Sequence, residues 1–197
     1  MILLIGFPKS GTTSFDTLFR QLGYTTYHWK KGSEYIGTLI RNNKRNGRPL
    51  LTGFAPDDCI TQMDVCISST DCYWPQFVDL EQLYNENKGA IFILNKRAPV
   101  KILQSFKKWN DYNGRLYRYN PELITDKTDT GFLEFVVDHY SRVETFFAAR
   151  PDAKFVTYDI EADTLDKLGC YIDLKGITEF PFENKNPRRG GPYTGGP

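Results

Sequence analysis

The sequence has almost no excess of charge of either sign. Its 25 lysines and arginines stand against 24 aspartates and glutamates, a formal net charge of +1. Sequence-independent binding to nucleic acid needs a cationic surface, so this balance argues against a nucleic-acid partner. Apolar runs of about 18 residues, the length that a membrane span needs, are also absent. The apolar N-terminus is too short for a signal peptide. We therefore predict a soluble, cytoplasmic protein.

Cysteine is scarce. The four cysteines, Cys59, Cys66, Cys72 and Cys170, form no C-x-x-C pair and have no zinc-type spacing. We therefore expect four thiols and no metal site, as in a reducing compartment, with a disulfide as the alternative.

The chain of 197 residues is long enough for one well-buried domain. Apolar strand-like segments alternate with helix-like segments, and strands are expected at residues 2–5, 24–29, 64–69, 90–95 and 153–158. This alternation predicts an α/β fold: a three-layer P-loop-type domain with a mostly parallel central sheet flanked by helices. We place this single domain at residues 1–186 and a Gly/Pro-rich tail, which contains Arg188 and Arg189, at residues 187–197.

Two further segments carry specific expectations. Residues 109–129 lack periodicity and are rich in Tyr, Asn and Arg, which predicts a long loop or lid. Residues 132–147 form the best helical stripe of the sequence. His139 lies on that stripe, so we expect a packed core histidine.

A glycine-bounded loop follows the first apolar run and ends where helical periodicity begins. It reads Gly6-Phe7-Pro8-Lys9-Ser10-Gly11-Thr12-Thr13-Ser14. Strand, loop and helix in this order are typical of a phosphate-binding loop, because backbone N–H groups and the helix N-terminus point at the anion. A nucleotide triphosphatase loop has lysine directly after its second glycine. Here Thr12 holds that position, and Lys9 lies two residues before Gly11.

This placement of lysine resembles the loop of sulfotransferases that use 3′-phosphoadenosine-5′-phosphosulfate (PAPS), in which the loop holds the 5′-phosphosulfate group. Weaker similarities to that family extend over roughly residues 2–186. The resemblance implies that the donor is bound by Lys9, Ser10, Gly11, Thr12, Thr13 and Ser14.

A second element agrees with this resemblance. The expected strand 90–95 leads into Lys96-Arg97-Ala98-Pro99, and Ser105 lies eight residues past Arg97. In sulfotransferases an arginine and a serine at this spacing hold the 3′-phosphate of the donor. A guanidinium fork and a hydroxyl at a helix N-terminus suit a phosphate dianion.

The resemblance implies a PAPS-dependent sulfotransferase that moves a sulfuryl group to a hydroxyl or amine by in-line displacement. Adenosine 3′,5′-bisphosphate (PAP) would leave, no metal would be required, and Lys9 would neutralise charge on the bridging oxygen. The acceptor, a small molecule or a glycan, stays open, as does the oligomeric state.

Three residues are candidates for the general base that accepts the acceptor's proton. His28 is expected at the end of the second strand, at the same sheet edge as the loop. Asp71 is expected at the end of another strand, where it would line the acceptor cleft or orient His28. Glu34, at the start of the second expected helix, ranks behind these two.

Two other functions remain as alternatives. The first is a nucleotide kinase or NTPase with an atypical loop, which would need Mg²⁺ and would be stabilised by ATP with Mg²⁺. The second is a sulfotransferase-like binding module without activity, which only a turnover assay distinguishes from an enzyme.

Overall fold

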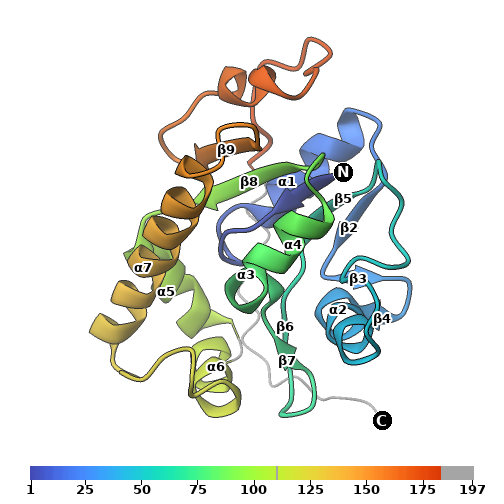
Figure 1. Ribbon diagram of the computed structural model, residues 1–197. Coiled ribbons are helices and arrows are strands. Elements are labelled where there is room, and N and C mark those ends of the chain that lie inside the picture. Colours follow the sequence, from blue (N-terminus) through green and yellow to red (C-terminus); the bar gives the residue numbers. More distant parts are fainter. Residues whose placement is uncertain (110, 183–197) are drawn as a thin grey trace.

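A seven-stranded sheet forms the centre of the computed structural model, which describes residues 1–109 and 111–182 (Figure 1). The strand order is β4-β3-β2-β5-β1-β8-β9. Strands β2, β5, β1, β8 and β9 are parallel, and β3 and β4 extend one edge in antiparallel fashion. The strands of this sheet are β1 (Ile2–Leu4), β2 (Thr26–His28), β3 (Lys30–Lys31), β4 (Glu34–Tyr35), β5 (Cys59–Gln62), β8 (Ile91–Lys96) and β9 (Lys154–Asp159).

Helices cover both faces of the sheet, which confirms the predicted α/β class (Figure 1). One face packs against α1 and the 3-10 helix η1, and the other against α3, α4, α5 and α7. The helices are α1 (Thr12–Gln21), α2 (Ile36–Arg45), α3 (Pro75–Val78), α4 (Leu80–Glu86), α5 (Pro99–Lys108), α6 (Tyr112–Tyr119), α7 (Asp129–Ala148) and η1 (Leu165–Cys170).

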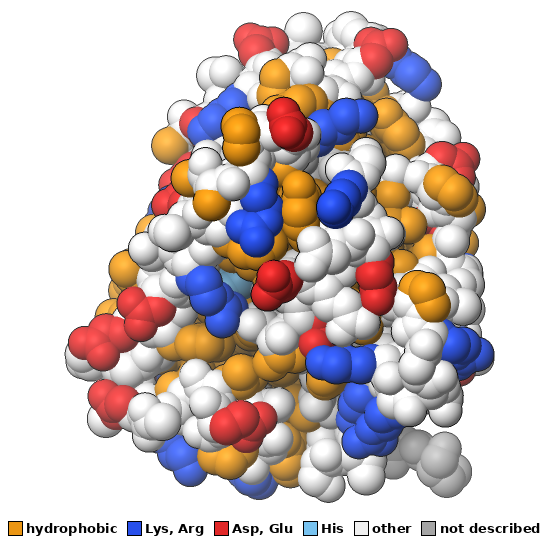
Figure 2. All heavy atoms as spheres, viewed as in Figure 1, with side chains coloured by type: hydrophobic (Ala, Val, Ile, Leu, Met, Phe, Trp, Pro, Cys, Tyr) orange, Lys and Arg blue, Asp and Glu red, His pale blue; other side chains and the backbone are white. Residues whose placement is uncertain are grey.

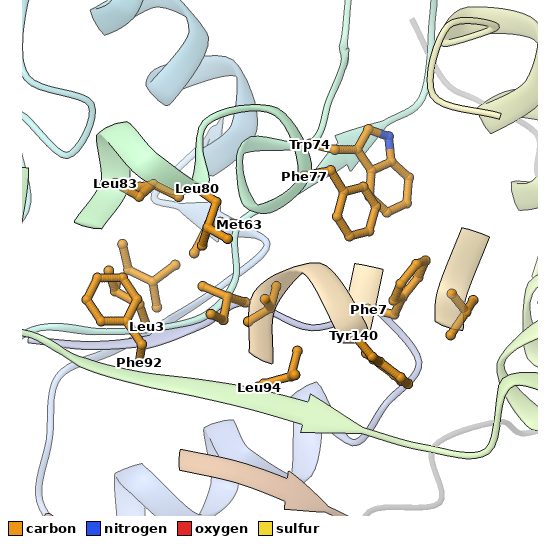
Figure 3. Packing of buried hydrophobic residues seen from close by; sticks show 14 of the residues in the cluster. Leu3, Phe7, Met63, Trp74, Phe77, Leu80, Leu83, Phe92, Leu94 and Tyr140 are labelled. Atoms are coloured by element: carbon orange, nitrogen blue, oxygen red, sulfur yellow. The ribbon is translucent and has the colours of Figure 1, made fainter. Parts of the chain in front are cut away.

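The unbroken apolar run at the N-terminus is explained by burial on both sides of β1. Successive side chains of a strand point to opposite faces of the sheet. Ile2 and Leu4 join the cluster beneath α1 and η1, whereas Leu3 joins the larger cluster beneath the helices of the other face. Figure 3 shows this larger cluster, in which the rings of Phe7 and Phe77 have centroids 4.7 Å apart.

The prediction of a core histidine in α7 is confirmed. His139 is buried, and its Nε2 donates a hydrogen bond to the carbonyl of Ile5, 2.8 Å away. Burial lowers the pKa of His139 to about 3, so the ring is neutral.

Local predictions failed around the middle of the chain. The central strand β5 was missed, because only one residue of its Cys-Ile-Thr-Gln sequence is strongly apolar. The strand expected at 64–69 is instead the short β6 (Val65–Cys66), which pairs with β7 (Cys72–Tyr73) in a separate hairpin. The expected loop at 109–129 contains α6, which buries only Tyr112 and Leu116 and therefore shows little periodicity.

The expectation of four thiols is wrong for two of the cysteines. Cys66 and Cys72 form a disulfide, whereas Cys59 and Cys170 carry thiols. The antiparallel register of the hairpin places Cys66 directly opposite Cys72. Spacing alone does not reveal this pair, because the pairing depends on a turn between two strands of two residues each.

Acidic and basic side chains are interspersed over the face shown in Figure 2. Within the described residues, no helix is both long enough and apolar enough to cross a membrane. The tail expected at 187–197, with Arg188 and Arg189, lies outside the described residues.

Candidate functional site

The loop between β1 and α1 turns sharply at two residues with positive φ. These are Lys9, at 69°, and Gly11, at 76°. A lysine in this conformation is uncommon, and such residues concentrate at functional sites. At Gly11 a Cβ would also lie 2.9 Å from Cγ2 of Ile160, so no other residue fits there without a shift.

Asn95, at the end of β8, holds the loop from within the sheet. Its Oδ1 accepts a hydrogen bond from the N–H of Gly6 at 2.9 Å. Its Nδ2 donates to the carbonyls of Phe7, at 3.2 Å, and of Ser10, at 3.0 Å. Because Asn95 is wholly buried, these bonds are shielded from water and fix the path of the loop.

The first turn of α1 completes the loop. Gly11 caps the helix without a side-chain hydrogen bond, and no acidic residue lies in the first turn. The first N–H groups of a helix have no partner within the helix and carry a partial positive charge, so they attract an anion. Thr12, Thr13 and Ser14 line the cavity in front of this turn.

Lys9 reaches into the same cavity from the loop. Its Nζ lies 3.9 Å from the centroid of the Trp109 ring, a cation–π contact. Burial, and then the positive charge of Arg97, lower the pKa of Lys9 to about 8. Near neutral pH the side chain is therefore mostly charged, but its charge is costly unless an anion compensates it.

Arg97 follows β8 and binds to the loop directly. Its Nη1 donates to the carbonyl of Lys9 at 3.0 Å, and its Nε donates to Glu161 at 3.2 Å. Glu161 also pairs with Lys101 at 2.8 Å. Burial raises the pKa of Glu161, but the hydrogen bonds from Lys101 and Arg97 outweigh this effect and lower it. Ser105, on α5, lines the same cavity.

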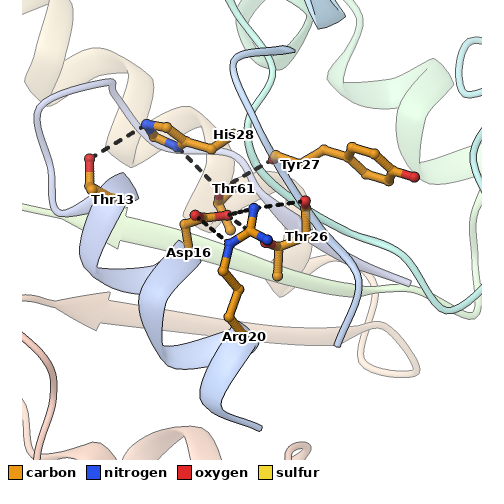
Figure 4. A network of polar contacts seen from close by, with 7 residues as sticks. All are labelled: Thr13, Asp16, Arg20, Thr26, Tyr27, His28 and Thr61. Atoms are coloured by element: carbon orange, nitrogen blue, oxygen red, sulfur yellow. Dashed lines mark hydrogen bonds and ion pairs between the residues drawn. The ribbon is translucent and has the colours of Figure 1, made fainter. Parts of the chain in front are cut away.

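His28 lies at the end of β2, where β2 and α1 are fastened together (Figure 4). Asp16 and Arg20 of α1 form an ion pair at 2.9 Å. Both bind Thr26 of β2, Asp16 accepting from its hydroxyl at 2.6 Å and Arg20 donating to its carbonyl at 3.2 Å. These contacts bring Nε2 of His28 to 3.5 Å from Oγ1 of Thr13.

The Thr61 hydroxyl lies beside the ring of His28. Its oxygen is 3.2 Å from Nδ1 of His28 and 3.3 Å from the carbonyl of Tyr27. In the tautomer that fits a Thr61 hydroxyl donating to Tyr27, Nδ1 donates to Thr61, and Nε2, which faces Thr13, is unprotonated.

These side chains line one cavity of about 390 Å³. Of the residues singled out in the sequence, it brings together Lys9, Gly11, Thr12, Thr13, Ser14, His28, Arg97 and Ser105. Among the described residues, no group of three or more His, Cys, Asp and Glu side chains is placed to hold a metal ion.

Three of the singled-out residues lie elsewhere. Ser10 is a buried residue of the loop and does not line the cavity. Asp71 also lies outside the lining, and its carboxylate accepts from Thr38 at 2.8 Å and from Arg41 at 3.5 Å. Glu34 is not at a helix start but in the exposed edge strand β4. The structure therefore leaves His28 as the candidate base that reaches the cavity.

A comparison with protein families matches residues 1–120 to the family described as "Sulfotransferase domain". The match covers more than half of the chain and includes Lys9, His28, Arg97 and Ser105. The chain belongs to this sulfotransferase family. A search of curated proteins found no match.

The candidate site contains a buried network that the sequence did not reveal. Asp64 is fully buried and accepts hydrogen bonds from Tyr112 at 2.6 Å, Gln62 at 3.2 Å and Gln76 at 3.2 Å. Gln62 in turn accepts from the hydroxyl of Thr12 at 3.4 Å. Burial raises the pKa of Asp64, although these hydrogen bonds act in the opposite direction.

These hydrogen bonds join Thr12, in the first turn of α1, to Tyr112 of α6, and Gln62 and Tyr112 both line the cavity. The sequence placed Asp64 at the start of an expected strand and gave no signal for this network. The role of Asn95 had no signal at all, because the residue simply completes an apolar strand.

Proposed function

We propose that residues 1–186 form a single catalytic domain that transfers a sulfuryl group from PAPS to a hydroxyl or amine acceptor. The observation that carries this proposal is the meeting of two anion-binding elements in one cavity. The Lys9–Ser14 loop is the first, and Arg97 with Ser105 is the second. The hydrogen bond from Arg97 to the carbonyl of Lys9 holds the two elements together.

The chemistry of these groups fits a donor with two separate anionic groups. The N-terminus of α1 and the hydroxyls of Thr12, Thr13 and Ser14 would hold the 5′-phosphosulfate. Arg97 and Ser105 would hold the 3′-phosphate, a group that ATP does not have. We call this part of the cavity, formed by the Lys9–Ser14 loop, Arg97 and Ser105, the donor end.

Bound PAPS would supply an activated sulfuryl group on an anionic leaving group. Lys9 would stabilise the negative charge that develops on the bridging oxygen, and its partial burial strengthens this interaction. The cations of the chain and the helix N-terminus supply the positive charge, so the proposed reaction requires no metal ion.

His28 would accept the proton of the attacking hydroxyl. In the tautomer in which Nδ1 donates to Thr61, the lone pair of Nε2 lies beside Thr13. A neutral imidazole held in one tautomer and next to the phosphate loop is well suited to general-base catalysis.

The test measures binding of PAP by calorimetry together with transfer of labelled sulfate from PAPS to a panel of phenols, alcohols, sugars and peptides. We expect the wild type to bind PAP and Arg97→Ala to bind it about 10- to 100-fold more weakly, because a charge-assisted hydrogen-bonding partner is lost. The matched control is Arg118→Ala, which removes an exposed arginine of α6.

Each result separates the competing functions. Equal affinity of Arg97→Ala and the wild type for PAP would contradict the assignment of the 3′-phosphate site. Stabilisation by ATP with Mg²⁺ and not by PAP would favour the kinase or NTPase alternative. Tight PAP binding without turnover of any acceptor would favour a binding module.

A further inference from the structure

A third cationic side chain, Arg115 of α6, lines the same cavity, and its hydrogen bond to Cys66 sets it beside the β6–β7 hairpin. Helix α6 packs beside β6 of the β6–β7 hairpin (Figure 1). The lining residues outside the donor end include Trp29, Ile67, Trp109 and Arg115, and Trp109 and His28 contact the donor end through Lys9 and Thr13. We call this group of residues the acceptor end.

The guanidinium of Arg115 is held by a backbone carbonyl and an aromatic ring. Its Nη1 donates to the carbonyl of Cys66 at 2.6 Å, and its Cζ lies 5.0 Å from the centroid of the Tyr112 ring. Its Nε is shielded from solvent and has no hydrogen-bond partner among the described residues. Burial lowers the pKa of Arg115, although nearby Tyr112 and Asp111 act in the opposite direction.

No carboxylate of the described residues forms an ion pair with Arg115. The nearby Asp111 instead pairs with Arg118 at 3.7 Å. Other cations of the cavity differ in this respect. Arg97 is paired with Glu161, and both Arg97 and Lys9 are assigned to the two anionic groups of the donor. Arg115 thus has no ion-pair partner within residues 1–109 and 111–182, and the proposed donor does not supply one.

The neighbours of Arg115 also restrict the shape of a ligand. Trp29 and Trp109 line the same cavity, and these residues are 36% and 48% exposed although Tyr35 packs on Trp29 and Lys9 contacts the Trp109 ring. Such surfaces favour a flat ring, of an arene or a sugar, whose polar groups point outward. A partly desolvated arginine favours a carboxylate or a sulfate ester, which it binds through charge-assisted hydrogen bonds.

We propose that Arg115 binds an acidic group of the acceptor, and that the acceptor is therefore a hydroxylated ring that carries a carboxylate or a sulfate. This inference rests on the proposed sulfotransferase function and adds the acceptor class to it. Arg115 would act as a specificity residue, because it would hold the acid while the hydroxyl of the same molecule lies near His28.

The experiment compares matched acceptors that differ in charge. We would use para-hydroxybenzoate against para-hydroxybenzamide, and glucuronate against glucose. Two measurements apply to each pair: kcat/KM for sulfate transfer, and the affinity of the acceptor for the PAP complex. For the wild type we expect the acid to exceed its neutral counterpart about 10- to 100-fold in at least one pair, the gain typical of a hydrogen bond to a charged group.

Three variants separate recognition from structure. Arg115→Gln removes the charge and keeps a side-chain donor for the Cys66 carbonyl, and it should reduce the acid-to-neutral ratio to within about threefold of unity. Arg115→Lys keeps the charge and should retain part of the preference. Arg118→Gln, one turn further along α6, should leave the ratio at the wild-type value.

PAP binding distinguishes this inference from the proposed function. If the wild type binds PAP but neither binds nor sulfates any of the acids in preference to its neutral partner, the acceptor class is wrong and the donor assignment stands. An unchanged ratio in Arg115→Gln would likewise overturn the role of Arg115. If the wild type does not bind PAP, the proposed function itself fails.

Discussion

The two ends of the cavity are built in different ways. The donor end combines one continuous loop with two residues that follow a neighbouring strand, β8, and Asn95 at the end of that strand anchors the loop. The acceptor end draws its side chains from β2, from the β6–β7 hairpin, and from the segment around α6. A disulfide, the Asp64 network and the contacts between α1 and β2 help to hold these elements together.

This difference between the two ends fits their proposed roles in binding the donor and the acceptor. A donor with fixed chemistry needs fixed geometry, which the hydrogen bonds from Asn95 and Arg97 to the loop provide. An acceptor can differ from one enzyme to another if its walls belong to peripheral elements that change without disturbing the sheet. The comparison predicts that substitutions at the two ends have separable effects on donor binding, acceptor binding and turnover.

The largest effect is expected at His28, where the two ends meet. His28→Gln should lower kcat by about 10²- to 10⁴-fold, the range for removal of a general base, and should change PAP affinity little. Steady-state kinetics and calorimetry measure the two quantities. The matched variant is Asp71→Asn, which should stay close to wild type because Asp71 does not line the cavity. A larger loss of kcat in Asp71→Asn than in His28→Gln would contradict the choice of base.

A smaller effect, confined to the donor end, is expected for Asn95→Asp. The new oxygen would face the carbonyls of Phe7 and Ser10 in place of a donor, so the free energy of unfolding should fall by about 2–4 kcal/mol. Because the loop loses its anchor, PAP affinity should fall as well. Urea unfolding and calorimetry test both expectations.

The control for Asn95 is Asn43→Asp. Asn43 is a buried amide that donates to the carbonyls of Leu50 and Thr52, both at 3.0 Å, far from the phosphate loop in the sequence. The Asn43→Asp variant should lower the free energy of unfolding by a similar amount and leave PAP affinity at the wild-type value. Equal losses of PAP affinity in both variants would show that general destabilisation, rather than the loop anchor, is responsible.

The smallest effect should fall on the acceptor end. A Cys66→Ala/Cys72→Ala double variant removes the disulfide of the hairpin and should lower the free energy of unfolding by about 2 kcal/mol. We expect a several-fold rise in KM for the acceptor and an unchanged affinity for PAP. Cys170→Ala, which removes an exposed thiol, is the control. A loss of PAP affinity in the double variant would refute the separation of the two ends.

Much of the fold and of the donor end could be predicted from the sequence. The apolar run at residues 2–5, the strand at 90–95 and the helical stripe around His139 lie where the sequence placed them. Their signals are local, since burial on both faces of a central strand requires an unbroken apolar segment. The weakly apolar β5 and the aperiodic α6 were not predicted, because their positions depend on partners elsewhere in the chain.

The sequence by itself determined the glycine-bounded loop, with lysine set before the second glycine, and the spacing from Arg97 to Ser105. Such features are encoded locally, because backbone torsions and the first turn of a helix depend on neighbouring residues. Only the tertiary structure decided that His28 rather than Asp71 reaches the cavity, that Cys66 pairs with Cys72, and that Arg115 lies at the acceptor end. Each of these depends on how segments distant in the sequence pack together. For His28 and the two cysteines, which lie in strands, a register shift of one residue would turn the side chain to the opposite face.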